Sequence, residues 1–422
     1  MLLDFILKIY LIVTGILLLL YMPRWRCWFY GRARQSRLAA KESRRIAVLI
    51  PARNESAAVA PLFDCLHRQT YPRDRFDVYV VVDRASDPTV QMAKDAGFIP
   101  HVVKNQHCKG DALDGVLKSI LSDHHNRHDA YLIIDADCML ADDFLAEMNN
   151  ALESGADIII SRKKLKNYFF GGRDKQPLSA CCNGLIWTLM DAMGNNAKTR
   201  HGDPCFVVGT GVMLTERVVR QNGGWPYRST VTEDVELMHD AVRQGWRTFY
   251  YQHAVLYMEE AVSHRVTNKR RRRWMTGVVD SKRLYAAMPT PENVPSRHLY
   301  HSRCMTIVYL LIGTSSLFAL GNAMAAVVFR TFRLPFWLPA LRNAVIGVGA
   351  IYAMFFVMTL FAIIADYENI KLPFLRKLIL LFVHPFFYME YIPIVAVALF
   401  TGYGRKWDAI ERVDFAESEI KS

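Results

Sequence analysis

Paired cysteines are missing from this sequence. Eight cysteines occur among its 422 residues, but no two of them form a C-x-x-C pair, and most lie in the middle of the chain. This pattern excludes a framework of closely spaced disulfides and predicts reduced thiols in the cytosol. Internal repeats and low-complexity tracts are also absent, which excludes a repeat array. The length fits two domains, or one large domain with a membrane part.

Acidic residues are nearly absent from two short stretches. Residues 24–45 hold eight lysines and arginines and a single acidic residue, Glu42. The second stretch runs from Lys269 to Arg273, and the whole chain carries a net charge of +12. Such a charge fits nucleic-acid binding, but basic blocks beside apolar segments more often face the inner leaflet, where each cation contributes about 1 kcal/mol. We therefore predict membrane lipids, and not nucleic acid, as partners.

A signal-peptide cleavage site is missing after the first apolar segment, Leu2–Tyr21. The segment is followed by Trp25, Trp28 and Tyr30, which are typical of a membrane interface, and then by arginines. This arrangement favours an uncleaved membrane anchor whose far end lies in the cytosol.

Three more apolar stretches lie near the other end of the chain. Residues 305–329 and 344–364 are each long enough to span a bilayer. Residues 374–400 are interrupted by Pro385, Glu390 and Pro393, which fits either one kinked span or a re-entrant pair. A cytosolic domain and a cytosolic tail require an even number of crossings between them.

These features predict a multi-pass protein of the plasma (inner) membrane whose site faces the cytosol. Its expected parts are a transmembrane helix (1–23), a basic juxtamembrane segment (24–44), a cytosolic α/β domain (45–280), an interfacial segment (281–304), a membrane region of two to four helical segments (305–402) and a cytosolic tail (403–422).

The middle of the chain alternates between apolar runs and helical stretches. The runs cover residues 46–50, 78–82, 131–134 and 157–160, and their composition predicts buried, largely parallel strands. Ligands bind beyond the carboxyl ends of such strands. Asp83 and Asp135 directly follow the second and third runs, so a binding site is expected there.

Two carboxylates alternate just past the third run, in Asp135-Ala136-Asp137. An extended D-x-D pair can place one carboxylate on a divalent cation and the other on a ribose or a metal-bound water. Mg²⁺ is typically held by one or two carboxylates plus substrate phosphate oxygens, and it neutralises charge on a departing diphosphate. An ordinary acidic turn is the alternative for an isolated match, but the preceding strand and the other motifs favour a metal site.

Further polar residues of the same sheet edge suit a nucleotide. Asp83 can accept a hydrogen bond from the imide N–H of uracil, although it can also cap a following helix. Lys109, next to Gly110, can direct its ammonium toward a base or a phosphate, although it can also be an exposed lysine in a turn. The loop from Pro51 to Glu55 opens the same edge.

Two motifs suit the sugar and its acceptor. Gly209-Thr210-Gly211 lets a sugar approach the backbone closely, unless it is only a tight turn. Thr232 is expected to cap a helix whose first turn holds Glu233 and Asp234. Asp234 is then well fixed as a general base, although both carboxylates can simply complement the helix dipole.

The basic block ends in Arg273-Trp274. Arg273 can clamp a diphosphate through paired N–H donors, and Trp274 can stack on an acceptor sugar. The alternative is a basic patch on an interfacial helix. We expect both, with the remaining arginines of the block, including Arg271, at the lipid surface.

In this order, the motifs resemble those of the processive-type membrane family 2 glycosyltransferases, which include hyaluronan, chitin, cellulose and poly-N-acetylglucosamine synthases. The resemblance covers about residues 45–277 and the layout of the flanking helices. Pro51 to Glu55 match its I-P-x-x-N-E motif, Asp83 matches its nucleotide Asp, Lys109-Gly110 match its K-G motif and Asp135/Asp137 match its D-x-D motif. Gly209 to Gly211 match its G-T-G motif, Thr232 to Asp234 match its T-E-D motif, and Arg270/Arg273/Trp274 match its Q-x-x-R-W motif. Arg270 stands where this pattern has glutamine, so processivity is not implied.

The resemblance implies a GT-A fold, a UDP-sugar donor, Mg²⁺ or Mn²⁺, and inversion to a β-linkage with Asp234 as base. It assigns donor binding to Pro51, Glu55, Asp83, Lys109, Asp135, Arg270 and Arg273, acceptor binding to Gly209, Thr210, Gly211, Glu233 and Trp274, and metal binding to Asp135 and Asp137. The expected function is β-glycosyl transfer from a UDP-sugar to a growing polysaccharide. Transfer to a lipid acceptor is the alternative with the same chemistry, and a catalytically inactive membrane scaffold is the alternative from another class.

Overall fold

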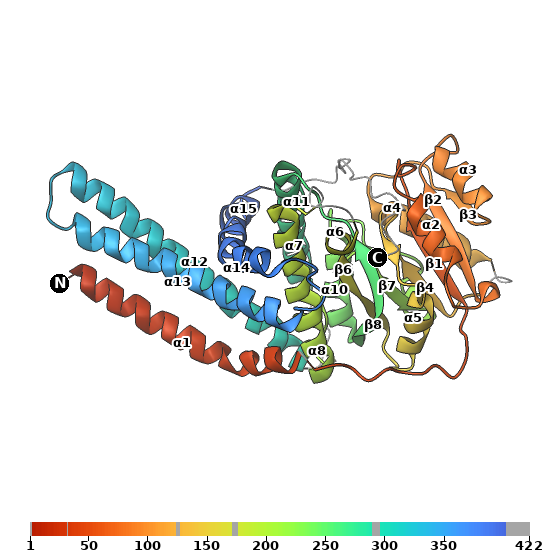
Figure 1. The fold of residues 1–422 in the computed structure, drawn as a ribbon, viewed down its shortest axis with the longest axis horizontal. Helices are drawn as coiled ribbons and strands as arrows, with labels where there is room; N and C mark the ends of the chain where they lie inside the picture. Colours follow the sequence, from red (N-terminus) through yellow and green to blue (C-terminus); the bar gives the residue numbers. More distant parts are fainter. Residues whose placement is uncertain (1, 32, 124–126, 171–175, 289–295, 402–422) are drawn as a thin grey trace.

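The structure, a computed structural model, describes residues 2–31, 33–123, 127–170, 176–288 and 296–401. It has an α/β domain at one end and a bundle of long helices at the other, with a layer of shorter helices between them (Figure 1). The predicted tail, residues 403–422, lies outside the described residues.

The α/β domain is built on one eight-stranded sheet of order β3-β2-β1-β4-β7-β6-β8-β5. The strands are β1 Ile46–Pro51, β2 Phe76–Val82, β3 Ile99–Val102, β4 Ala130–Ile133, β5 Met139–Leu140, β6 Ile158–Leu165, β7 Val212–Thr215 and β8 Thr248–Met258. Neighbours among β1 to β4 are parallel, whereas β7 is antiparallel to both β4 and β6. All four predicted strands are present, and the inserted β7 makes the sheet mixed.

The central strand β1 is buried on both faces of the sheet. Val48 and Ile50 belong to one hydrophobic cluster, which includes side chains of α2, α3 and α5. Ala47 and Leu49 point to the opposite cluster, which includes side chains of α4, α9 and α10. This double burial explains the continuous apolar run, because a strand covered by helices on both sides has no polar face.

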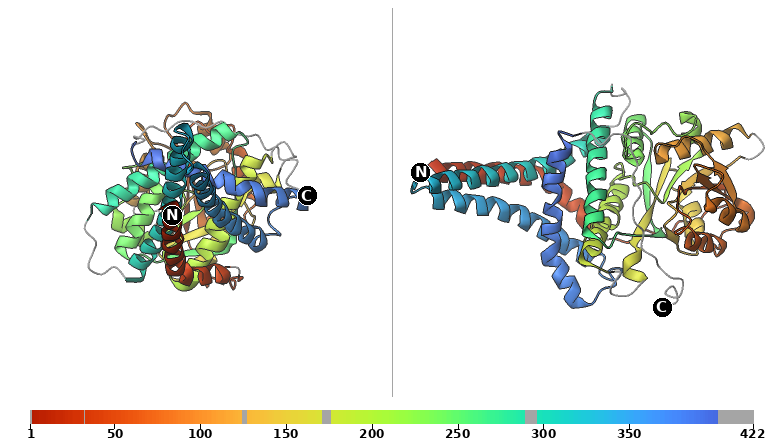
Figure 2. Two further views of the ribbon diagram at one scale, coloured as in Figure 1. Left: turned by 90° about the vertical axis from the view of Figure 1, so that its left-hand side faces the viewer. Right: turned by 90° about the horizontal axis from the view of Figure 1, so that it is seen from above.

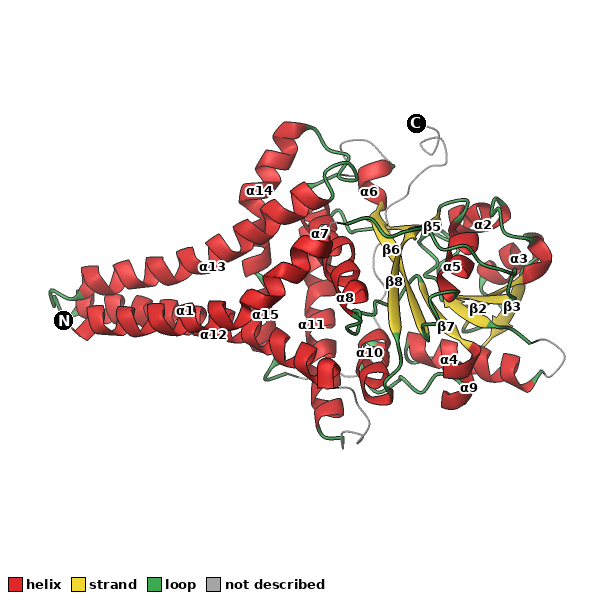
Figure 3. Ribbon diagram, turned by 90° about the horizontal axis from the view of Figure 1, so that it is seen from below, coloured by secondary structure: helices red, strands yellow, loops and turns green. Residues whose placement is uncertain are grey.

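The helices of this domain and of the layer beside it are α2 Ala60–His67, α3 Pro88–Asp95, α4 Lys109–Ser122, α5 Phe144–Leu152, α6 Lys166–Phe169, α7 Leu178–Thr188, α8 Asn196–His201, α9 Glu216–Asn222, α10 Glu233–Gln244 and α11 His264–Ala286. A 3₁₀ turn spans Arg73–Arg75 and a π-helical segment spans Leu189–Asn195. Figure 3 shows α7, α8 and α11 between the sheet and the long helices.

The long helices are α1 Leu2–Gly31, α12 Ser296–Thr331 and α13 Trp337–Ala365. They lie side by side and project away from the α/β domain (Figures 1 and 2). Among the described residues, four segments are long enough and apolar enough to cross a membrane: Leu2–Tyr21, Ile307–Thr331, Trp337–Ala365 and Phe374–Ala398.

The fourth stretch differs from the other three in its direction. It consists of α14 Phe374–Met389 and α15 Tyr391–Ala398, which run crosswise to the bundle at the end next to the α/β domain (Figure 2, right). The face of α14 directed away from the protein carries exposed apolar side chains: Phe374, Leu375, Leu378, Ile379, Phe382 and Phe386.

Arg271 does not lie at the lipid surface, so that expectation is wrong. Its side chain is fully buried between α11 and the crosswise helices. The guanidinium donates to Glu390 at 2.9 Å and to the carbonyl of Phe387 at 3.3 Å, and it lies over the rings of Phe387 and Tyr391. Arg272, in contrast, is exposed. Neighbouring arginines on one helix point in different directions, which a run of identical letters does not reveal.

Arg271→Ala is expected to lower the thermal midpoint in detergent, whereas the matched variant Arg272→Ala should leave it unchanged. We expect a loss of roughly 2 kcal/mol, because a fully buried side chain is truncated and its carboxylate partner loses its counter-charge. Equal midpoints for the two variants would contradict the buried placement of Arg271.

Candidate active site

Asp83 lies at the carboxyl end of β2, where its carboxylate is held by two arginines. Arg53 Nε lies 2.9 Å from one oxygen, and Arg84 Nη1 lies 3.4 Å from the other. Asp83 does not cap the following helix, because the N-cap of α3 is Asp87. The two arginines fix this carboxylate at the edge of the sheet.

Lys109 stands at the centre of the site. It is the first residue of α4, and its ammonium contacts Asp135 Oδ1 at 2.5 Å, the carbonyl of Gly209 at 2.5 Å and Glu233 at 3.6 Å. Its side chain is only 14% exposed, which rules out the exposed lysine in a turn. Lys109 therefore joins three of the predicted motifs.

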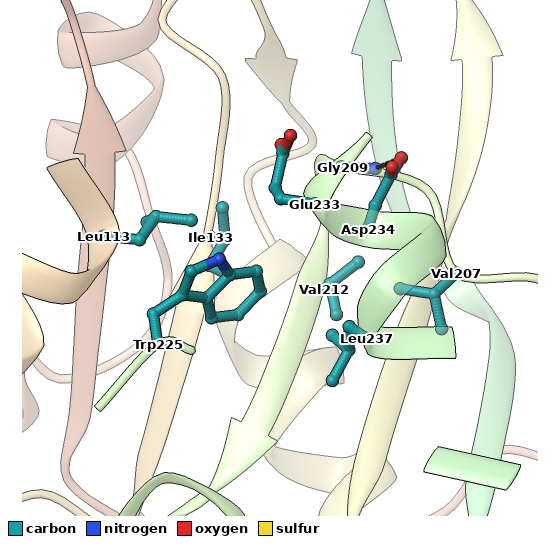
Figure 4. Close-up of a pocket in the computed structure, with 9 residues that line it drawn as sticks. All are labelled: Leu113, Ile133, Val207, Gly209, Val212, Trp225, Glu233, Asp234 and Leu237. Carbon is teal, nitrogen blue, oxygen red and sulfur yellow. Dashed lines mark hydrogen bonds between the residues drawn. The ribbon is translucent and has the colours of Figure 1, made fainter. Parts of the chain in front are cut away.

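Glu233 and Asp234 begin α10, as the sequence predicted. Asp234 accepts hydrogen bonds from the backbone N–H of Gly209 at 2.8 Å and from that of Val235 at 2.9 Å. Figure 4 shows both carboxylates on the same side, above the apolar residues that line the small cavity beneath them. Thr232 is the N-cap residue of α10, as predicted, but its side chain makes no capping hydrogen bond. Its hydroxyl instead lies 3.3 Å from the hydroxyl of Ser281 on α11.

Burial and neighbouring charges shift the pKa values of Glu233, Asp234 and Lys109. Burial raises the pKa of Glu233 to about 7, with a further rise from Asp234 and an opposing effect of Lys109. Burial also raises the pKa of Asp234, against Lys109 and the two backbone donors. For Lys109, the carboxylates of Asp135 and Glu233 outweigh burial and raise its pKa. A carboxyl group with a raised pKa is a stronger proton acceptor once it is ionised.

Activity is expected to fall as the pH drops through about 7, because the Glu233–Asp234 pair then gains a proton and the base loses its accepting form. Glu233→Gln removes the negative charge beside Asp234 and lowers the pKa of that carboxyl. The acidic limb of kcat/KM should therefore move to lower pH in this variant. An unmoved limb, measured over the same pH range, would contradict the coupling of the two carboxylates.

Glycines allow the close packing around this cluster. A methyl group at Gly209 would come within 3.3–3.5 Å of Lys109, Asp234 and Glu233. Gly211 has a φ of +65°, and a Cβ there would lie 2.0 Å from the hydroxyl of Ser161. Gly209 and Gly211 thus allow a tight turn against neighbouring side chains, and Thr210 accepts from the backbone N–H of Asp135 at 3.0 Å. The approach of a sugar to this backbone stays a prediction.

Asp135 and Asp137 follow β4, at the edge of the same cluster. Asp135 is partly exposed and Asp137 is largely buried, with the ammonium of Lys166 bonded to the Asp137 carbonyl at 3.3 Å. No group of three or more His, Cys, Asp or Glu among the described residues could enclose a metal ion. Two carboxylates beside an open edge nevertheless fit Mg²⁺ or Mn²⁺, since these ions commonly complete their coordination with substrate phosphates.

Trp274 and Arg270 lie on α11, beside α7. Trp274 packs edge-to-face on Trp187 of α7, with the ring centroids 6.0 Å apart. Arg270 lies over Trp274, with its guanidinium carbon 5.4 Å from the ring centroid, and its Nη1 is 3.4 Å from Glu260. Arg273 is half-buried on the same helix. Trp187 and Glu260 were not predicted, because neither stands in a recognisable motif.

The structure thus brings Lys109, Asp135, Gly209, Glu233 and Asp234 into direct contact. Asp83, the Pro51–Glu55 loop and Asp137 follow strands at the same edge of the sheet. Arg270 contacts Glu260 and Trp274 rather than this cluster. Arg53 was missed as a partner of Asp83, although it stands inside the predicted loop.

The chain is similar in sequence to two curated proteins. A probable glycosyltransferase of Bacillus subtilis, YdaM, is 23% identical over 250 residues, which cover 56% of each chain. A beta-monoglucosyldiacylglycerol synthase of Trichormus variabilis is 22% identical over 203 residues, which cover 46% of this chain and 40% of that one. The match therefore spans about half the length of these curated relatives.

A solved structure shows the same fold. A mannosyltransferase from Pyrobaculum calidifontis, in complex with GDP-Man and Mn²⁺, superposes with a TM-score of 0.60 at 19% identity, covering 87% of this chain and 98% of that one. This likeness confirms the predicted GT-A type of α/β fold. Residues 43–277, more than half of the chain, match the family described as glycosyltransferase like family 2. The protein therefore belongs to the family 2 glycosyltransferases and is a transferase.

Proposed function

We propose that this protein transfers a sugar from a UDP-sugar to a membrane lipid, with inversion to a β-linkage, at the cytosolic face of the plasma membrane. The observation that carries the transfer is the position of Asp234. It is a half-buried carboxylate with a raised pKa, fixed by two backbone donors and placed beside Lys109 and the D-x-D pair. In this role, an oxygen of Asp234 takes the proton of the acceptor hydroxyl as the acceptor oxygen bonds to the anomeric carbon. The bond from that carbon to the diphosphate oxygen breaks, and UDP leaves with the electron pair.

Asp83 supports the choice of a nucleotide donor. Its carboxylate, held by Arg53, accepts an N–H donor at the edge of a base. Uracil offers its imide N–H, and guanine also offers N–H donors, whereas adenine presents an acceptor at the corresponding ring nitrogen. We propose a UDP-sugar, with Pro51 and Glu55 beside the base and Lys109, Asp135 and Arg273 toward the phosphates.

A divalent cation fits the same site. Asp135 and Asp137 would hold Mg²⁺ or Mn²⁺, and the ion would neutralise charge on the departing diphosphate. Lys109 already stabilises negative charge at this position, since its ammonium lies on Asp135 Oδ1. The leaving nucleoside diphosphate would thus depart toward the ion and the ammonium of Lys109.

The membrane part supports a lipid acceptor. Three helices project as one bundle, and α14 and α15 lie crosswise with an apolar face exposed (Figure 2). A helix pair with this direction and this face suits the membrane interface. Two crossings after the catalytic domain, by α12 and α13, then return the chain to the cytosolic side. An acceptor lipid reaches such a site from the bilayer surface without a channel.

Transfer to a growing polysaccharide is the second candidate, favoured by the motif order and by Trp274, whose half-buried ring can stack on a sugar. Gly209, Thr210, Gly211 and Glu233 would contact the acceptor in both cases.

Nucleotide release and product analysis test these proposals together. Purified protein in detergent is given UDP-glucose, UDP-N-acetylglucosamine, UDP-glucuronate or GDP-mannose, each with and without diacylglycerol. We expect release from a UDP-sugar and a labelled product that extracts into organic solvent. A water-soluble product of increasing length would support the polysaccharide, release from GDP-mannose alone would overturn the UDP assignment, and no release would leave the inactive scaffold.

A further inference from the structure

Glu260 is a fully buried carboxylate at the junction between β8 and α11. Its backbone is held on both sides by Asn167, whose side-chain oxygen accepts from the Glu260 N–H at 3.0 Å and whose amide donates to the Glu260 carbonyl at 3.1 Å. The carboxylate is therefore fixed in position before any contact with substrate is made.

Each oxygen of this carboxylate has a donor on α7. The indole N–H of Trp187 donates to Oε1 at 2.8 Å, and the amide of Asn183 donates to Oε2 at 2.9 Å. The Trp187 ring has one N–H, so this hydrogen bond fixes the rotation of the ring as well as its place.

The charge of Glu260 is balanced from α11. Arg270 Nη1 lies 3.4 Å from Oε2, and the Arg270 side chain is only 12% exposed. The same guanidinium lies over the ring of Trp274, which in turn packs edge-to-face on Trp187. Glu260 thus holds one tryptophan directly and the other through Arg270, across two helices that neighbour each other (Figures 1 and 3).

A buried carboxylate requires a cation or several strong donors, because leaving it unpaired costs several kcal/mol. Arg270 supplies this cation here. A guanidinium engaged with Glu260 and with the face of Trp274 is poorly placed to clamp a diphosphate as well. Arg270 was predicted to bind the donor, and its contacts instead point to the tryptophan pair.

We infer that Glu260 is a positioning residue for the acceptor, and that Arg270 serves Glu260 rather than the donor diphosphate. The carboxylate orients Trp187 through its ring N–H and Trp274 through Arg270, and so shapes the surface on which the acceptor lies. The inference rests on the proposed function, because it concerns the acceptor of the same transfer reaction.

The test uses the full-length protein in detergent and two charge-removing variants, Glu260→Gln and Arg270→Gln, together with the double variant. The measured quantities are KM for a UDP-sugar, KM for diacylglycerol, and the slow release of UDP without acceptor. Arg272→Gln is the matched control, since Arg272 is exposed on the same helix.

We expect each single variant to raise the acceptor KM by ~10-fold and to leave the donor KM and the acceptor-free release within about twofold. The double variant should recover to within about threefold of the wild type, because it leaves no unbalanced charge between α7 and α11. Trp187→Phe, which removes only the N–H donor and part of the ring, should raise the acceptor KM even if Glu260→Gln fails to fold.

Two results would overturn the inference. A raised donor KM in Arg270→Gln with no rescue in the double variant would mean that Arg270 binds the donor. Losses that simply multiply in the double variant would mean that Glu260 and Arg270 act independently. Both results require UDP release by the wild type, so they differ from failure of the proposed function, in which the wild type releases no UDP with any donor.

Discussion

Asp234→Asn is expected to reduce sugar transfer by ~10²–10⁴-fold, the usual cost of losing a general base. The asparagine side chain keeps an oxygen that can accept from the Gly209 N–H, which lies 2.8 Å from the carboxylate in the native protein. The local backbone should therefore be preserved while proton acceptance is lost.

The measurements are the transfer rate and the affinity for UDP. We expect UDP affinity to stay within a few-fold, because Asp234 accepts hydrogen bonds from the backbone N–H groups of Gly209 and Val235, which asparagine can also do. Asp240→Asn is the matched control on the same helix. Its side chain accepts from the Tyr227 hydroxyl at 2.8 Å, a contact that the amide oxygen retains. Near-normal transfer by Asp234→Asn would remove this residue from the mechanism.

The positions of Asp83 and Asp135 could be predicted from the sequence. Both were placed at a site because they follow buried parallel strands, and the carboxyl ends of such strands meet at one edge. The structure confirms the strands, and Lys109 and Asp234 reach the cluster from the starts of α4 and α10. The place of such motifs in the fold can be predicted, because parallel strands all end at the same edge of the sheet and the helices that follow them begin there.

Contacts made across the fold could not be predicted in this way. The bond between Trp187 and Glu260 joins residues that are 73 positions apart, and no periodic pattern relates them. The burial of Arg271 depends on where α14 packs, which the sequence of the basic block does not encode. Likewise, hydropathy reports that residues 374–398 are apolar, but it does not report the direction in which α14 and α15 run. Tertiary packing decides these features.

Helix α11 links the candidate active site to the crosswise helices on the membrane side. On one face, Arg271 packs against Phe387 and Glu390 of the crosswise segment. On another, Ser281 lies 3.3 Å from Thr232, just before the helix that carries Asp234. Gly277 allows this approach, since a Cβ there would lie 2.4 Å from the side chain of Thr232. One helix thereby connects the start of the helix that carries Asp234 to the crosswise helices.

Asp137→Ala is expected to abolish the dependence of donor binding on a divalent cation. Asp137 is one of two carboxylates at the end of β4, and Asp135 is already engaged by Lys109. Loss of Asp137 therefore leaves a single carboxylate that must be shared between an ammonium and a metal ion. Because Mg²⁺ and Mn²⁺ need a protein anchor as well as phosphate oxygens, the ion should no longer strengthen donor binding.

Calorimetric titration of the UDP-sugar, in Mn²⁺ and in a chelator, measures this effect without relying on turnover. For the wild type we expect Mn²⁺ to tighten donor binding by at least ~10-fold, within the range seen when metal sites are disrupted. For Asp137→Ala the two titrations should agree, and their common affinity should match that of the wild type in chelator. Asp142→Ala is the matched control, since its side chain is 61% exposed and lies 3.5 Å from the guanidinium of Arg68. If the wild type binds the donor equally well in chelator, Asp137 holds no metal and Lys109 alone must balance the charge of the diphosphate.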